Sequence, residues 1–273
     1  MEEKLISFDI KADFGFLKKP DINEGIYLTY NCLHKPALLG ILGAIIGLGG
    51  FYQSYVQKNK AAGNSLPEYF DKLSDIKIGI QPLAVKGNFV KTVIKYNNSV
   101  GYASEEQGGN LIVNEQTLIK PTYRVFLLLH LENSYEKKLF EYINNSECEF
   151  IPYLGKNDFQ IWWDKNNVKE YSFTKNHAVS ESHPIENLFI KPAGKTIRQN
   201  TADPVDEMID WLQPITNDFF ILFERLPIGY DEKTSNYKFG EFVFTNNKLV
   251  PSFLCASSNI FHLEDVDKFV QLN

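Results

Sequence analysis

The sequence predicts an α+β fold, and three stretches carry the prediction. Residues 5–10 alternate apolar and polar side chains, as a half-buried strand does. Pro36 opens a long apolar, glycine-containing run, which is typical of a helix because proline is tolerated at the first helical position. Residues 123–130 are the strongest strand candidate, and they precede an amphipathic helix at 135–143. Strands and helices therefore alternate irregularly along one chain.

The amino-acid composition limits the classes of protein to which the chain can belong. The chain has 273 residues, of which 44% are hydrophobic and 23% charged, as in a folded globular protein. Its 21 Phe, 14 Tyr and 3 Trp suit a strand-rich core and could also stack on nucleobases. The net charge of -6 disfavours a broad nucleic-acid-binding surface, but it allows one local basic patch.

The cysteines and the hydropathy pattern indicate a compartment. Cys32, Cys148 and Cys255 lie far apart and match no metal-ligand spacing, and their odd number argues against a disulfide framework. The apolar run from 37 to 48 is shorter than a membrane span of roughly 20 residues. No signal segment is expected at the start. We expect a cytoplasmic protein without cofactor or metal.

The helix expected over residues 36–48 carries glycines on one face. Gly40, Gly43 and Gly47 recur at spacings of three and four residues. Each glycine costs a helix interior about 1 kcal/mol relative to alanine. The pattern indicates that another backbone, from a sheet or from an RNA strand, approaches this face; tight packing of the helix on a sheet is the structural alternative.

The remaining elements complete a recognisable order. Residues 75–118 are expected to form a long two-stranded excursion, and 148–153 a further strand. Strand, helix, excursion, strand, helix and strand give the βαββαβ order of ferredoxin-like domains, the scaffold of RNA-recognition modules. We expect this domain at residues 1–160 and a β-rich accessory region at 161–273.

Three segments resemble, in order, the signatures of the CRISPR-associated protein Cas-five family, within the RAMP superfamily. The first is residues 30–47 (YNCLHKPALLGILGAIIG), where a basic-proline pair precedes a glycine-rich apolar helix. The second is 116–124 (QTLIKPTYR), which leads into an apolar strand, and the third is the turn 153–159 (YLGKNDF). The likeness covers roughly the first 160 residues and is closest to the type I-B branch.

The resemblance implies a role and partners. Members of the family are subunits of the Cascade surveillance complex in antiviral defence, and they cap it by holding the 5′ handle of the CRISPR RNA. A hairpin called the thumb, here residues 75–118, reaches toward the backbone subunit, and another face meets the large subunit. Whether this protein also contacts the target DNA, near the motif that flanks the target, is left open by the sequence.

Residues before the first helix are candidate RNA contacts. The helix N-terminus at Pro36 offers unpaired N–H groups and a positive dipole end to a phosphate. Asn31, His34 and Lys35 precede it and add donors, and Tyr30 could stack on a base. If these residues do not contact RNA, we expect Lys35 to be a solvated loop residue, His34 a surface residue and Tyr30 part of the core.

The other RNA-contact candidates lie on the excursion and in the matched segments. Arg124 could grip a phosphate through its planar fork, or it could pair with Glu132 in the same sheet. The lysines could equally be ordinary solvated residues. The remaining candidates are Gly40, Lys86, Asn88, Lys91, Gln116 and Lys156.

We expect a protein that binds RNA without cutting it. One branch of the resembled family, type I-C, processes precursor RNA without metal, which requires an acid and a base. His34 lies in the expected binding motif, and His130 ends an apolar strand and is expected to be satisfied there. The alternatives are a metal-independent endoribonuclease and a purely structural adaptor, the latter using exposed aromatics such as Trp162.

Overall fold

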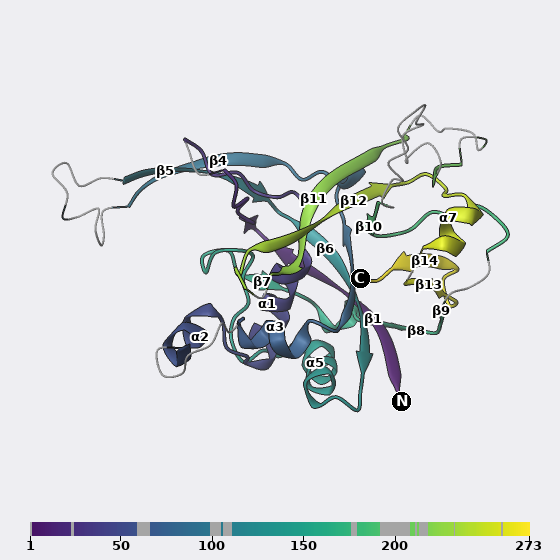
Figure 1. Ribbon diagram of the computed structural model, residues 1–273, viewed down its shortest axis with the longest axis horizontal. Helices are drawn as coiled ribbons and strands as arrows, with labels where there is room; N and C mark the ends of the chain where they lie inside the picture. The colour runs from purple at the N-terminus through teal and green to yellow at the C-terminus, as the bar shows by residue number, and fades with distance from the viewer. Residues whose placement is uncertain are drawn as a thin grey trace.

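The computed structural model describes residues 2–22, 25–58, 66–98, 105, 111–175, 179–191, 208–210, 212, 218–231, 233–257 and 259–273. Within these ranges the protein is an α+β fold made mainly of antiparallel strands with few helices, as expected (Figure 1). No helix in the described part of the chain is long and apolar enough to cross a membrane.

A five-stranded sheet forms the centre of the fold. Its strands are β1 (Glu3–Ala12), β3 (Lys77–Pro82), β6 (Thr122–His130), β7 (Ile161–Trp162) and β8 (Lys169–Tyr171). The order is β3-β6-β1-β7, β8 also pairs with β1, and all pairings are antiparallel. The apolar runs in β1 and β6 therefore lie side by side and are almost wholly buried.

Helix α1 (Lys35–Ile46) carries much of the core. It contacts α3 (Glu68–Leu73) and α5 (Ser134–Asn145), which lie near it in Figure 1. Gly43 explains one of the helix glycines, because a Cβ there would lie 2.4 Å from Cβ of Tyr69 on α3. The close approach is thus made by a tyrosine side chain, and the expectation of a second backbone at this point is corrected. The fully buried α1 side chains are Leu38, Leu39, Leu42 and Ile45.

A separate hairpin projects from the main body (Figure 1). It consists of β4 (Lys91–Asn98) and β5 (Leu111–Ile119), and β2 (Phe14–Gly15) pairs with the base of β5. The expected excursion at 75–118 started too early, because β3 belongs to the central sheet and hydrogen-bonds along β6. Alternation alone could not distinguish a sheet strand from a hairpin strand.

The chain after β8 forms two further three-stranded antiparallel sheets, ordered β10-β12-β11 and β14-β13-β9. Leu226, Phe242 and Phe244 from the first of these join the same hydrophobic core as β1 and α1. The elements are β9 (Phe173–Lys175), β10 (Phe189–Ile190), β11 (Ile221–Tyr230), β12 (Tyr237–Thr245), α7 (Pro251–Ala256), β13 (Ile260–Leu263) and β14 (Lys268–Gln271). Helix α2 (Phe51–Lys58) follows α1.

The strand expected at 148–153 does not form. Instead, Glu149 and Phe150 donate main-chain hydrogen bonds to Ile45 and Ala44 at the end of α1 (2.9 and 3.1 Å). The place beside β1 that this strand would have filled is taken by β7 and β8. Central-sheet pairing therefore continues past residue 160, where we had expected a boundary.

Candidate nucleic-acid interface

His34 is the N-cap of α1 and is buried. Its Nδ1 accepts a hydrogen bond from the main-chain N–H of Ala37 (3.3 Å), and its ring packs edge-on against Tyr30 and Tyr237. Burial lowers the pKa of His34 from 6.5 to about 3. A neutral, enclosed imidazole cannot attract a phosphate, so the expected RNA contact is corrected to a capping role.

This burial predicts an acid sensitivity. Because the folded pKa of His34 lies below the unfolded one, the unfolded state takes up the proton between about pH 6.5 and 3. The stabilisation is present above pH 6.5 and is lost as the pH falls, by up to about 1.4 kcal/mol per pH unit. Urea unfolding at several pH values should show this slope, and a His34→Asn variant, which keeps a cap acceptor, should show a shallower one. Parallel slopes in the two proteins would contradict the prediction.

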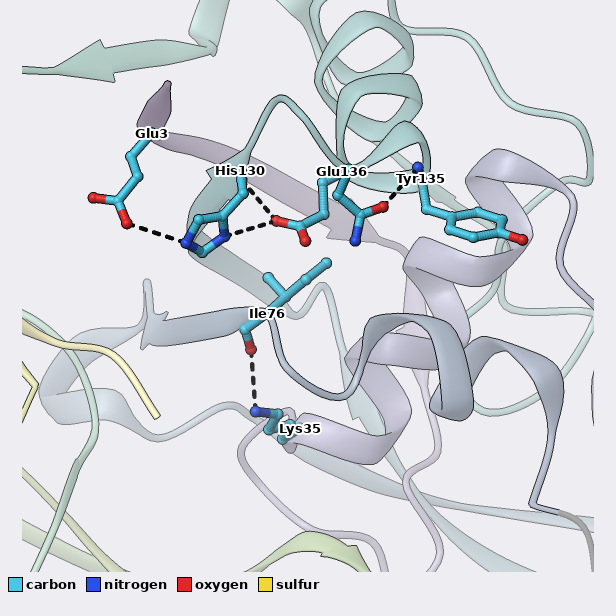
Figure 2. Close-up of polar contacts among 7 residues, drawn as sticks. Glu3, Lys35, Ile76, His130, Tyr135 and Glu136 are labelled. Atoms are coloured by element: carbon cyan, nitrogen blue, oxygen red, sulfur yellow. Dashed lines mark hydrogen bonds and ion pairs between the residues drawn. The ribbon is translucent and has the colours of Figure 1, made fainter. Parts of the chain in front are cut away.

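Lys35 also has a structural role. Its ammonium donates to the main-chain oxygens of Ile76 (3.1 Å) and Asn273 (3.0 Å), and Figure 2 shows it directed at the former. Burial lowers the pKa of Lys35 to about 8. The side chain links the start of α1 to the segments around β3 and β14, so Lys35 has a structural role, and its expected contact with RNA stays a prediction.

Asn31 positions the loop before the hairpin. It is buried, donates from Nδ2 to the carbonyl of Gly87 (2.7 Å), and accepts at Oδ1 from the N–H of Phe89 (3.0 Å). These bonds use its amide on the protein itself, which corrects the expected RNA contact. They also fix the segment that carries two other candidates, Lys86 and Asn88.

The remaining candidates divide by exposure. Lys86, Asn88 and Lys91 are exposed around the base of the hairpin, where a ligand can reach them. Gln116 on β5 is half-buried. The 3-10 turn that contains Lys86 lies against β11.

Two cationic candidates are paired within the protein. Arg124 makes a forked ion pair with Asp9, its cross-strand neighbour on β1, with Nε–Oδ1 and Nη2–Oδ2 distances of 2.7 and 2.9 Å. The alternative partner, Glu132, was thus the wrong acid. Lys156 binds the buried carboxylate of Glu115 on β5 (2.7 Å). Each cation thus has an acidic partner within the protein, and a contact with phosphate stays a prediction for both.

The histidines other than His34 that the structure describes form no metal site. His130 lies between two carboxylates, with Nε2 3.1 Å from Glu3 and Nδ1 3.2 Å from Glu136 (Figure 2). It is thus held at the end of β6, as expected for a satisfied histidine. No group of three or more His, Cys, Asp or Glu within the described ranges could hold a metal ion.

A groove of about 650 Å³ opens where the loop around residue 20 faces β11 and β12. We call it the cationic groove. Phe223 and Arg225 enter it from β11, and strand alternation puts them on one face. The cationic and aromatic residues that line it are Lys19, Tyr30, Phe223, Arg225, Tyr237 and Phe239.

Cations and rings alternate in the cationic groove. The guanidinium of Arg225 lies 4.4 Å from the ring centre of Phe239, and the Lys19 ammonium lies 5.2 Å from that of Tyr30. Phe223 and Arg225 are exposed. Cationic side chains beside the exposed ring of Phe223 and the half-buried rings of Tyr237 and Phe239 suit a single strand, whose phosphates the cations can bind and on whose bases the rings can stack.

Two acidic side chains, Asp21 and Glu224, also line the groove and offset the charges of its two cations. Glu224 accepts hydrogen bonds from the main-chain N–H groups of Asn31 and Cys32 (2.8 and 2.9 Å), which tie the motif loop to β11. The groove therefore has little net charge, and it should hold bases by stacking and only one or two phosphates by charge.

Of the predicted contacts, only Tyr30 lines the cationic groove, and its side chain is only 3% exposed, as in the alternative of a core tyrosine. Sequence reasoning missed Lys19 and the β11 and β12 residues. A signal was present, because Phe223 and Arg225, like Tyr237 and Phe239, are spaced two apart, and residues at that spacing on a strand share a face.

No family model matches the chain, and no curated protein matches it. Among solved structures, a chain of a CRISPR RNA-guided surveillance complex is 14% identical, over 92% of this chain and 94% of its own length, with a TM-score of 0.42. A chain of the type III-B Cmr-beta complex bound to cognate target RNA is 8% identical, over 98% and 99%, with a TM-score of 0.48. The functionally uncharacterized protein SMU1763c from Streptococcus mutans is 13% identical, over 63% and 69%, with a TM-score of 0.31. These similarities are distant and concern only the path of the main chain.

Proposed function

We propose that this chain is an RNA-binding subunit of a type I CRISPR effector complex, which holds the 5′ handle of the CRISPR RNA and joins the backbone and large subunits. The observation that carries the proposal is the cationic groove, where Arg225 and Lys19 flank three exposed or half-buried rings. Such a site fits a short single strand better than a duplex, because duplex bases are stacked inside.

Two features of the fold support the family assignment within this proposal. The strand order β3-β6-β1-β7, with α1 after β1 and α5 after β6, is the order expected of a ferredoxin-like βαββαβ domain. The first resembled motif also has a direct connection to the groove, since Tyr30 lines it and Glu224 binds the backbone at Asn31.

We propose further that the bound RNA is not cut here. Cleavage without metal needs a base and an acid beside the scissile phosphate. None of the described residues lining the cationic groove is a histidine, and His34, which lies behind Tyr30, is buried with its Nδ1 engaged.

The proposal is tested with the purified chain and labelled repeat RNA, with and without its 5′ handle. We expect the handle to strengthen binding at least tenfold, which corresponds to about 1.4 kcal/mol. With one or two phosphate contacts, the logarithm of affinity should fall with a salt slope of only about 0.7 to 1.4. A gel of the same samples should show intact RNA.

Each other outcome selects an alternative. Site-specific cleavage would indicate an endoribonuclease of the type I-C kind. Absence of binding, both alone and with co-expressed partner subunits, would leave the structural adaptor. Tight binding whose affinity falls steeply with salt concentration would indicate that RNA binds a broad basic surface and not the cationic groove.

A further inference from the structure

A second groove, of about 590 Å³, lies on the other side of Tyr237. We call it the apolar groove. One wall is the small-residue face of α1, including Gly40 and Ala44, and the opposite walls come from the start of α2 and from residues 150–153. Tyr69, Tyr230 and Tyr237 also line it, with Tyr230 and Tyr237 stacked at 5.1 Å between ring centres.

The exposed apolar side chains of the protein concentrate here. Five of the fifteen large hydrophobic side chains that are exposed in the described ranges line this one groove, and Tyr52 and Ile151 are 76% and 63% exposed. An apolar patch of this kind marks an interaction site, since monomeric surfaces usually scatter such residues singly. The five are Phe51, Tyr52, Phe150, Ile151 and Tyr153.

The walls are held in place without an occupant. The main-chain bond from Phe150 to Ala44 fixes the 150–153 segment against α1, and the Glu149 carboxylate is held by Lys138 and Tyr142 (2.8 Å each). At Gly40 a Cβ would meet the Tyr69 ring only at 3.7 Å, an ordinary contact. Packing on Tyr69 therefore does not require glycine there.

Charge identifies the kind of occupant. None of the described residues that line the apolar groove has a charged side chain, whereas the cationic groove has two cations, Lys19 and Arg225, beside the acids Asp21 and Glu224. A nucleic acid would bring phosphates to walls that offer them no cation. Exposed Tyr and Phe side chains around an uncharged hollow are instead typical of the centre of a protein–protein interface.

Shape argues against a second copy of this chain in a two-fold contact. Such a contact places a surface against itself, and two hollows cannot fill one another. We propose that the apolar groove binds a protruding, uncharged apolar segment of a different polypeptide, another subunit of the assembly. The identity of that assembly rests on the proposed function, but the site and the chemistry of its occupant do not.

The test uses the native complex, purified from the source cells through a tag on this chain, with a photo-crosslinking phenylalanine analogue at position 151. We expect the crosslink to join an uncharged apolar segment of a stoichiometric partner protein. Ile151→Glu and Tyr52→Glu should each reduce recovery of that partner at least tenfold. Val266→Glu, a control at an exposed valine in the turn between β13 and β14, should not.

The outcomes separate this inference from the proposed function. All three variants should keep the wild-type melting temperature and the affinity of the isolated chain for handle RNA, because none of these residues lines the cationic groove. A crosslink to RNA, to a second copy of this chain or to nothing would overturn the docking site. So would undiminished recovery of the partner in both groove variants. Loss of RNA binding by the wild-type chain would refute the function alone.

Discussion

Replacing Arg225 with alanine is expected to weaken the binding of single-stranded handle RNA by about 10- to 100-fold. A hydrogen bond between charged groups contributes about 1.5–3 kcal/mol, and each 1.4 kcal/mol is a factor of ten. The side chain is exposed, and its ion pair with Glu241 is long, at 3.7 Å. Such surface pairs contribute little, so the fold should be unaffected. Fluorescence anisotropy measures the affinity, and thermal unfolding checks the fold.

A matched control variant separates the effect of the position of Arg225 from the effect of losing one positive charge. Lys169→Ala on β8 also removes one exposed positive charge, but outside the cationic groove. If binding depends on the groove, this variant should change the affinity less than about twofold. Equal losses in both variants would show that the RNA responds only to the net charge of the protein.

Replacing Gly155 with alanine is expected to destabilise the fold by at least about 3 kcal/mol, the largest stability effect that we predict. Gly155 has a φ of +87°, and a Cβ there would lie 1.7 Å from the carbonyl oxygen of Phe16. Strained backbone costs about 1–3 kcal/mol, and relieving the overlap would also disturb the hydrogen bond from Phe16 N–H to the Leu154 carbonyl (3.0 Å). Urea unfolding measures the loss.

Gly40→Ala is the control for Gly155→Ala. Gly40 lies in α1 with space for a methyl group, so alanine should leave the free energy of unfolding unchanged or raise it by up to about 1 kcal/mol. A Gly155→Ala variant within about 1 kcal/mol of wild type would contradict the account of the third resembled motif as a turn fixed by close backbone contact.

The local elements could be predicted because their signals are local. The alternation at 5–10, the proline in the first turn of α1 and the apolar run of β6 each lie within one segment, and each element formed where expected. The strand at 148–153 failed because the main chain of Phe150 binds the end of α1, and β7 and β8 occupy the sheet edge. That competition depends on residues far apart in the sequence.

The candidate site was harder to predict for the same reason. Helix-terminus reasoning correctly placed His34 and Lys35 at the start of α1, but whether a side chain there faces solvent or core depends on β12 and on the residues after β14. Arg124 found Asp9 through the register of β1 and β6, which the sequence does not state. The cationic groove joins residues about 200 positions apart, so only the two-residue spacing on β11 and β12 could have suggested it.

The central claim, that single-stranded RNA lies in the cationic groove, is tested most directly by ultraviolet crosslinking of the chain to labelled handle RNA, followed by identification of the crosslinked residues. The account predicts crosslinks at Phe223, Tyr237 or Phe239, because these exposed or half-buried rings can stack on bases. They should be lost in Arg225→Ala. Crosslinks confined to other faces of the protein would contradict it.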